Sequence, residues 1–179
     1  MEKIGWESSF HLFLSRITSA LSLNPFGLST YTPPLTWLMQ GRRPIAVTAV
    51  TRQYKRDVYP KVDDDATIIV EYPGATGLIE ASWNWPYSIK DMEVFGETGY
   101  IHALDSKNIS STKRGKRPVS KQAEALPAPI NDPIPYLAAV IQNQIPGTDD
   151  LSSLKYNMIV MEILDAAKRS AATGKRIVL

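Results

Sequence analysis

Residues 66–104, ATIIVEYPGATGLIEASWNWPYSIKDMEVFGETGYIHAL, decide the fold of this chain. They contain four short runs rich in β-branched and aromatic residues. The runs are separated by Pro73-Gly74, Pro86-Tyr87-Ser88 and Gly96-Glu97-Thr98-Gly99, which are typical turn sequences. Connections this short favour antiparallel neighbours, because a parallel pair needs a long crossover. The stretch therefore predicts four consecutive strands in an antiparallel meander.

The second of these strands carries two tryptophans on a single face. In an extended chain, Gly77, Ile79, Ala81, Trp83 and Trp85 all point to the same side. If helices cover that side, the tryptophans belong to the core. If it is the uncovered side, they form an aromatic patch that marks an association surface. Ile79, Trp83 and Trp85 are therefore candidate interface residues, and the sequence leaves both alternatives open.

Further strands are expected before and after this meander. Residues 45–54 alternate and are β-rich, which predicts a first strand. Residues 109–112 and 119–122 predict a last ribbon around the basic cluster Lys113–Arg117. Prolines at positions 127 and 129 then mark a linker in which the chain leaves the sheet.

Two helices follow the linker. Asp132-Pro133 predicts the start of the first, which carries Leu137, Val140 and Ile141. The second is predicted from Ser152 or Ser153 to about Thr173, and Gly174 ends it. It has one apolar stripe, formed by Tyr156, Ile159, Val160, Ile163, Ala167 and Ala171. Strands followed by helices predict an α+β two-layer sandwich, with a largely antiparallel sheet, helices on one face and no Rossmann domain.

The first 40 residues do not fit this pattern. We expect an amphipathic helix from about Glu7 to Leu21, followed by a loose stretch, because Asn24-Pro25 and Pro33-Pro34 interrupt regular structure. The apolar residues 10–14 are too few for a membrane span and make a poor signal peptide. The predicted organisation is an atypical, partly helical or loose segment over residues 1–40 and a main domain over residues 41–179.

Composition excludes several classes of function. The formal charge of +2 gives no overall field toward nucleic acid or anionic membrane, so we predict neither as a partner. The chain has no cysteine, which is compatible with a reducing cytoplasm. Its two histidines, His11 and His102, do not have ligand spacing, so no metal site is predicted. Asp63-Asp64-Asp65 lacks the alternating oxygens of a calcium loop and is interpreted as a charged loop.

Motifs for chemistry are also missing. The sequence contains no Gly-x-Gly-x-x-Gly fingerprint, no phosphate loop and no Gly-x-Ser-x-Gly elbow. Glu80, Glu93 and Glu97 fall on predicted strands or turns without a recognisable partner. The cluster Lys113–Arg117 is interpreted as a solvated hairpin tip, with a phosphate or nucleic-acid patch as the alternative. From the residues alone, this is a domain without a complete active site.

Fragments spread over residues 41–179 nevertheless resemble one family in order and spacing. They include the sequence from Gly41 to Pro44, residues 77–83, residues 94–101, Asp132-Pro133, and residues 163–167 with Ser170 and Gly174. Together they resemble the C-terminal domain of the glucose–fructose oxidoreductase and inositol dehydrogenase (Gfo/Idh/MocA) family. The resemblance implies a fold like the second domain of dihydrodipicolinate reductase.

The resemblance also implies a function. Family members carry an N-terminal Rossmann domain that binds NAD or NADP, and they oxidise or reduce sugars, cyclitols and polyols. Their C-terminal domain shapes the substrate pocket with its helical side, and its open sheet face makes the oligomer. By this resemblance, the chain is a substrate-binding and oligomerisation domain that forms a homo-oligomer through its sheet. It binds no cofactor alone and works with a separate Rossmann domain.

The chain departs from the family pattern at its beginning. It lacks the nucleotide-binding half and the Glu-Lys-Pro segment whose lysine takes part in catalysis in the family. Residues 24–31 stand where the family has an Asp-x-Gly-x-His/Tyr helix, and Tyr31, one residue out of register, is the only catalytic candidate. Residues 1–34 look replaced, as by a truncated gene, an altered frame or an internal start. We therefore expect a domain that is inactive alone, with a catalytically silent dimeric binding module or truncated product as the alternative.

Overall fold

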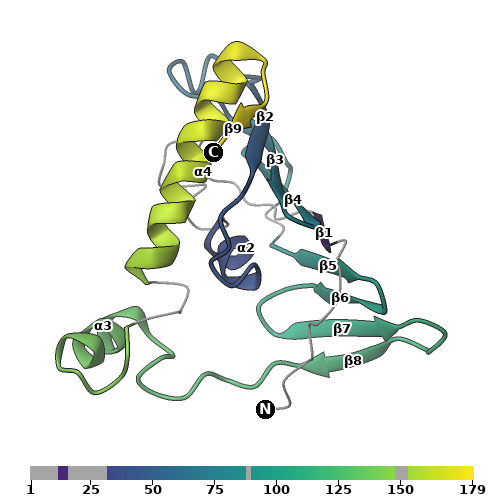
Figure 1. Ribbon diagram of the computed structural model, residues 1–179, viewed down its shortest axis with the longest axis vertical. Helices are drawn as coiled ribbons and strands as arrows, with labels where there is room; N and C mark the ends of the chain where they lie inside the picture. The colour runs from purple at the N-terminus through teal and green to yellow at the C-terminus, as the bar shows by residue number, and fades with distance from the viewer. Residues whose placement is uncertain (1–11, 16–31, 88–89, 148–152) are drawn as a thin grey trace.

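The computed structural model describes residues 12–15, 32–87, 90–147 and 153–179 (Figure 1). The strands within these ranges form a single sheet in the order β8-β7-β6-β5-β1-β4-β3-β2-β9. The strands are β1 (Leu12–Ser15), β2 (Ala46–Arg52), β3 (Asp65–Tyr72), β4 (Ala75–Ser82), β5 (Met92–Gly96), β6 (Gly99–Ala103), β7 (Asn108–Lys113), β8 (Val119–Gln122) and β9 (Ile177–Val178). The helices are α2 (Thr32–Leu38), α3 (Pro133–Ile141) and α4 (Leu154–Thr173).

The predicted fold class is confirmed. Helices α2 and α4 lie against one face of a sheet in which every neighbouring pair but one is antiparallel (Figure 1). All four strands predicted between residues 66 and 104 are present, as β3, β4, β5 and β6. The ribbon predicted around Lys113–Arg117 is also present, as β7 and β8.

The prediction of an uninterrupted meander is wrong, because β1 lies between β4 and β5. It pairs with β4 in parallel and with β5 antiparallel. The helix expected from Glu7 to Leu21 is therefore wrong for residues 12–15, and the rest of that segment lies outside the described residues. A short isolated helix is marginal in water, whereas a four-residue strand in the middle of a sheet gains hydrogen bonds on both sides.

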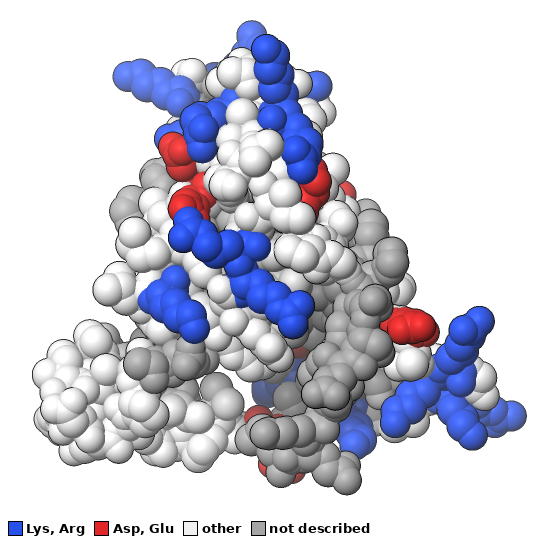
Figure 2. All heavy atoms as spheres, in the orientation of Figure 1, with Lys and Arg blue, Asp and Glu red and all other residues white. Residues whose placement is uncertain are grey.

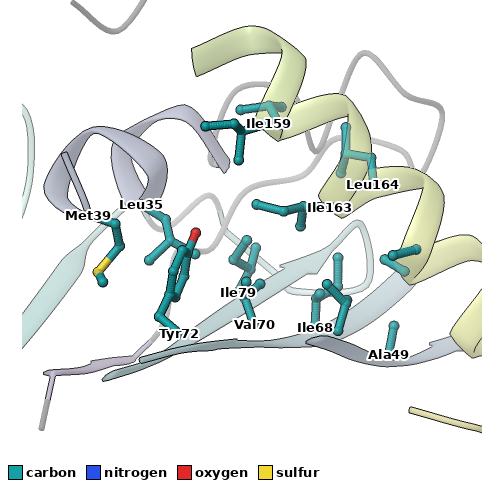
Figure 3. Close-up of a cluster of buried hydrophobic side chains, with 14 of the residues drawn as sticks. Leu35, Met39, Ala49, Ile68, Val70, Tyr72, Ile79, Ile159, Ile163 and Leu164 are labelled. Atoms are coloured by element: carbon teal, nitrogen blue, oxygen red, sulfur yellow. The ribbon is translucent and has the colours of Figure 1, made fainter. Parts of the chain in front are cut away.

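The core lies between the sheet and the two covering helices (Figure 3). Alternate residues of the central strands point into it, among them Ala49, Ile68, Val70 and Ile79. The helices contribute Leu35 and Met39, from α2 and the turn after it, and the α4 stripe of Ile159, Val160, Ile163 and Leu164. Because α2 precedes residue 41 and still packs into this core, the main domain's core extends into the segment predicted to be atypical.

Close packing of α2 depends on a glycine in β4. A Cβ added at Gly77 would lie 2.7 Å from a methyl carbon of Leu35. Leu35 is fully buried, so it has no free space into which to move. Gly77 therefore lets the helix approach the sheet at this point.

Helix α4 begins and ends as its sequence predicts. The side chain of Ser153 accepts a hydrogen bond from the Tyr156 N–H, and Gly174 adopts a left-handed conformation with φ of 66° at the C-terminal end. The predicted apolar stripe is largely buried. Local sequence signals therefore define both ends of this helix and the face that it buries.

Helix α3 begins as predicted but does not join the core. Asp132 caps it by accepting a hydrogen bond from the Ile134 N–H at 2.9 Å. Only Ala139 of this helix is buried, whereas Leu137 and Ile141 are exposed. The helix stands apart from α2 and α4 at the lower left of Figure 1. The expectation that both C-terminal helices cover the sheet is thus correct for α4 alone.

Candidate functional site

The face of the sheet that points away from α2 and α4 is the first candidate for a functional surface. We call it the open face. Its side chains alternate with those of the core, and strand register places Thr48 beside Ile69 and Val50 beside Thr67. Val50, Ile69 and Phe95 are exposed on it. Neighbouring exposed apolar side chains make the open face a candidate association surface.

A cluster of titratable side chains lies on the open face at β5 and β6. The Tyr100 hydroxyl donates a hydrogen bond to Glu93 across the hairpin. His102 Nε2 lies 3.3 Å from Asp91 Oδ2. The rings of Phe95 and Tyr100 stack with their centroids 4.5 Å apart. The expectation that Glu93 has no partner is therefore wrong; strand register, which the sequence does not show, brings Tyr100 beside it.

The electrostatics of this cluster favour binding over catalysis by Tyr100. Burial raises the pKa of Tyr100 to about 12, and the hydrogen bond and charge of Glu93 and the charge of Asp91 act in the same direction. The phenol therefore stays neutral at physiological pH and acts as a hydrogen-bond donor. It is a poor general base, since the pKa of an effective base lies near the working pH.

Asp64 organises the loops at one end of β2, β3 and β4. Its Oδ1 accepts hydrogen bonds from the Tyr54 N–H and from Asn84 Nδ2, each at 2.9 Å, and its Oδ2 accepts one from the Lys55 N–H at 2.6 Å. Burial raises the pKa of this carboxyl, but the hydrogen bonds from Tyr54, Asn84 and Lys55 outweigh it and leave the pKa below its ordinary value. The middle residue of the aspartate run is thus a structural anchor within the chain.

The structure separates the three predicted interface residues. Ile79 is completely buried in the core beneath the helices, so it cannot contribute to an exposed patch. Trp83 and Trp85 lie beyond the end of β4 at Ser82, and both are partly exposed. The Trp83 ring packs against the Tyr59 ring with centroids 4.5 Å apart, and its carbonyl accepts a hydrogen bond from Lys55 Nζ. Neither tryptophan is at the centre of the core or of the open face.

The basic cluster Lys113–Arg117 forms the tip of the β7–β8 hairpin. The residues of this tip are exposed, and Figure 2 shows basic side chains projecting there at the lower right. Gly115 turns the chain with a φ of 73°. The geometry agrees with a solvated tip. Its position next to β8, which ends the sheet on this side, suits a second role, since charges on edge strands discourage pairing with other chains.

A groove of about 740 Å³ lies between the C-terminal half of α4, β2 and residues 60–63. Its apolar lining includes Ala49, Ile68, Leu164 and Ala167, and its charged residues are Lys61, Asp63, Asp165 and Lys168. These charges balance, so the groove favours neither an anion nor a cation. No sequence pattern indicates this groove, because its walls come from four separate segments, in β2, residues 60–63, β3 and α4.

The remaining sequence expectations concern single residues and absences. Tyr31 and His11 lie outside the described residues, and the role of Tyr31 stays a prediction. Within the described ranges, no group of three or more His, Cys, Asp or Glu side chains is arranged to hold a metal ion. Among the helices of those same ranges, none combines the length and apolar character needed to cross a membrane.

The fold and its surfaces define a class of protein: an α+β domain with a two-layer arrangement, one face of its sheet covered by helices and the other open. The comparisons make this more specific. Residues 32–102 match the family model described as GFO/IDH/MocA C-terminal domain. The resemblance expected from the sequence is therefore confirmed for this part of the chain, and the match begins with α2.

Solved oxidoreductases share this fold over nearly the whole chain. Aldose–aldose oxidoreductase from Caulobacter crescentus, complexed with glycerol, aligns at a TM-score of 0.71 and 15% identity, covering 96% of this chain and 56% of its own. An inositol dehydrogenase homologue from Azotobacter vinelandii, complexed with NADH and myo-inositol, aligns at a TM-score of 0.65 and 14% identity. This alignment covers 96% of the present chain and 57% of the homologue. The WlbA dehydrogenase from Bordetella pertussis, in complex with NADH and UDP-GlcNAcA, aligns at a TM-score of 0.63 and 17% identity. This alignment covers 96% of the present chain and 55% of the dehydrogenase.

This chain thus spans somewhat more than half of the length of the solved proteins that it matches. Identities this low establish the shared fold and nothing finer. A comparison with curated proteins found no match.

Proposed function

We propose that this chain is the substrate-binding and oligomerisation domain of an NAD(P)-dependent oxidoreductase of sugars or polyols. We further propose that it is inactive without a nucleotide-binding domain. One observation carries the proposal. Nearly the whole chain aligns with 56% of an aldose–aldose oxidoreductase and 57% of an inositol dehydrogenase homologue, and the latter was solved with NADH. Each of these enzymes has a further part that the alignment leaves uncovered.

The residues of this chain do not fit the cofactor. A dinucleotide is held where a glycine-rich turn leads from a strand into a helix, so that the backbone approaches the pyrophosphate. The sequence has no Gly-x-Gly-x-x-Gly, and the pairs Gly74/Gly77 and Gly96/Gly99 have a different spacing. In the structure, the first pair spans the start of β4 and the second spans the turn between β5 and β6. In the proposed enzyme, NAD(P) therefore belongs to a different domain.

The open face supports a role in oligomer formation. Threonines and exposed apolar side chains cover β2 and β3 on this face, and Phe95 continues the apolar surface on β5. Helices α2 and α4 cover the opposite face (Figure 1), so an interface on the open face would leave the helical side of the sheet for a substrate and a nucleotide-binding domain. A cytoplasmic location stays a prediction from the sequence.

The proposal is tested in two steps. The chain alone, titrated with NADH and followed by nucleotide fluorescence, should show no saturable binding in the micromolar range. The DNA upstream of the codon for Met1 should encode a nucleotide-binding domain. Producing that domain together with this chain should give NAD(P)-linked oxidation of at least one member of a panel of aldoses, inositols and glycerol.

Each result has a defined meaning. Micromolar NADH binding by the chain alone would overturn the proposal that a different domain binds the cofactor. If the combined domains bind NADH but oxidise no member of the panel, the assignment of substrate class is wrong. In that case, the alternative of a catalytically silent binding module is favoured.

A further inference from the structure

Helix α3 is apolar on every side and yet is largely uncovered. Its sequence, PIPYLAAVI, contains no charged residue, and Ile134, Leu137 and Ile141 are 73%, 53% and 69% exposed. Asp132 is the only charged residue from Ala125 to Gly147. Figure 2 accordingly shows no charged side chain on the visible part of the lobe at the lower left, where α3 lies. A helix that is hydrophobic all round is normally buried, so α3 lacks its covering surface.

Helix α4 carries a second uncovered apolar surface. Leu154, Met158 and Met161 are 76%, 61% and 49% exposed, and their spacing of four and three residues places them in one stripe. The stripe lies on the side opposite the buried residues of α4. Further along the same side, the side chains become charged, with Asp165, Lys168 and Arg169. We call residues 154, 158 and 161 the outer stripe; it is confined to the first half of the helix.

These two surfaces match each other in chemistry and length. Both are uncharged and aliphatic, and methionine side chains adapt to the shape of a partner. At 1.5 Å per residue, the nine residues of α3 extend about 13 Å, and the outer stripe extends about 10 Å. All six side chains are exposed, so the two surfaces do not cover each other within one chain. The ten residues from Ala123 to Asp132 that connect β8 to α3 give the helix reach away from the sheet.

We propose that two copies of this chain exchange their α3 helices, so that α3 of each copy packs on the outer stripe of the other. A second copy supplies one α3 and one outer stripe, which is the ratio in which each copy leaves them uncovered. The reciprocal contact closes under two-fold symmetry. Strongly apolar surfaces without charges are typical of permanent homodimers, whereas transient interfaces are more polar. This exchange does not involve the open face and needs no nucleotide-binding domain, so it goes beyond the proposed function and does not rest on it.

Cross-linking tests the exchange directly, because the natural chain has no cysteine. We expect the double variant Leu137→Cys/Met158→Cys to form a covalent dimer under mild oxidation, seen on a non-reducing gel. Leu137→Cys alone, Met158→Cys alone and the control pair Val58→Cys/Met158→Cys should stay monomeric on that gel. Val58 is exposed and lies in the loop between β2 and β3, away from both surfaces in the sequence. A disulfide within one chain, no cross-link, or a dimer from Leu137→Cys alone would each overturn the proposal.

Light scattering provides a second test without a covalent bond. Leu137→Lys should halve the mass of the assembly at low micromolar concentration and raise its dissociation constant at least about tenfold. Val58→Lys is the matched control and should leave the mass unchanged. Leu137 is exposed in the single chain, so circular dichroism should report an intact fold. A wild-type chain that is monomeric at its highest soluble concentration overturns the exchange and leaves a nucleotide-binding domain as the occupant of this surface.

Discussion

The hydroxyl of Ser170 joins helix α4 to strand β2 through the backbone of Ala49. Ser170 Oγ accepts a hydrogen bond from the Ala49 N–H at 2.9 Å and donates one to the Lys175 carbonyl at 2.6 Å. Strand β9 pairs with β2 only at Ala46 and Val47, so the serine provides a partner where the strand pairing has stopped. One fully buried side chain thus connects the end of the helix, the turn after it and the sheet.

Replacing this serine should destabilise the fold. Ser170→Ala leaves the Ala49 N–H and the Lys175 carbonyl without their hydrogen-bond partner, and we expect a loss of about 1–3 kcal/mol in the free energy of unfolding. Urea denaturation measures it. Thr173→Ala is the matched control: its hydroxyl also donates to a carbonyl, that of Arg169, but at an exposed position, and its loss should stay within about 0.5 kcal/mol. Equal losses in both variants would contradict the role assigned to Ser170.

Asp64 should make the stability depend on pH in the acid range. The native pKa of this carboxyl lies below the ordinary value of 3.8, because the hydrogen bonds from Tyr54, Asn84 and Lys55 outweigh the effect of burial. The carboxylate therefore contributes stability above that value, and the contribution is lost as the pH falls through the native pKa. Asp64→Asn should cost about 1.5–3 kcal/mol at pH 7, since hydrogen bonds to a charged group are lost.

The pH profile distinguishes this role from a general loss of packing. The difference between wild type and Asp64→Asn should shrink as the pH falls below the ordinary pKa of 3.8 and through the lower native pKa, where the folded wild-type carboxyl takes up a proton. Asp63→Asn provides the control for the neighbouring aspartate and should leave the unfolding free energy nearly unchanged. A constant difference between Asp64→Asn and wild type from pH 7 to pH 2 would show that the charge is unimportant.

Gly77 and Leu35 should behave as a coupled pair. Gly77→Ala places a Cβ 2.7 Å from Leu35, and overpacking of this kind costs about 1–3 kcal/mol. Leu35→Ala removes the obstructing methyl groups but leaves a cavity that costs about 2–5 kcal/mol. In the double variant, the added methyl group at position 77 no longer meets the Leu35 side chain. The double variant should therefore lose less unfolding free energy than the sum of the losses of the two single variants. Strict additivity in urea denaturation would show that α2 does not rest on Gly77.

Much of this fold is predictable from local sequence because local signals determine it. The alternation in residues 66–104 specifies four strands, and Ser153, the buried stripe and Gly174 specify α4. The position of β1 cannot be predicted in this way. Leu12–Ser15 pairs with residues 75–77 and 93–95, and nothing in its own four residues identifies strands so distant in sequence. A short apolar run can form either a helix or a strand, and its own sequence does not show which until the neighbouring strands of the sheet are known.

The candidate surfaces were predictable only in part, for a similar reason. The alternation of residues 77–85 correctly placed Ile79 on one side, but only the packing of α2 and α4 shows that this side is the covered one. The pairing of Tyr100 with Glu93 depends on strand register, which brings Phe95 opposite Tyr100 and Glu93 opposite His102. Helix α3 has clear start signals, but its sequence does not reveal that it stands outside the core.

The open face should control one step of assembly, separately from the exchange of α3. Val50 is exposed on this face beside Thr67, so Val50→Lys should leave the fold intact while introducing a charge that an interface must desolvate. We expect the mass measured by light scattering to fall by half, with a dissociation constant raised at least about tenfold. Lys substitution of Val119, exposed on β8, is the control and should have no effect. If Val50→Lys and wild type have the same mass over the whole concentration range, the open face is not an interface. The second outcome is that Val50→Lys lowers the mass but the Leu137→Cys/Met158→Cys cross-link still forms when Val50→Lys is also present. The chain then has two independent interfaces, and two such interfaces are enough to build a closed tetramer.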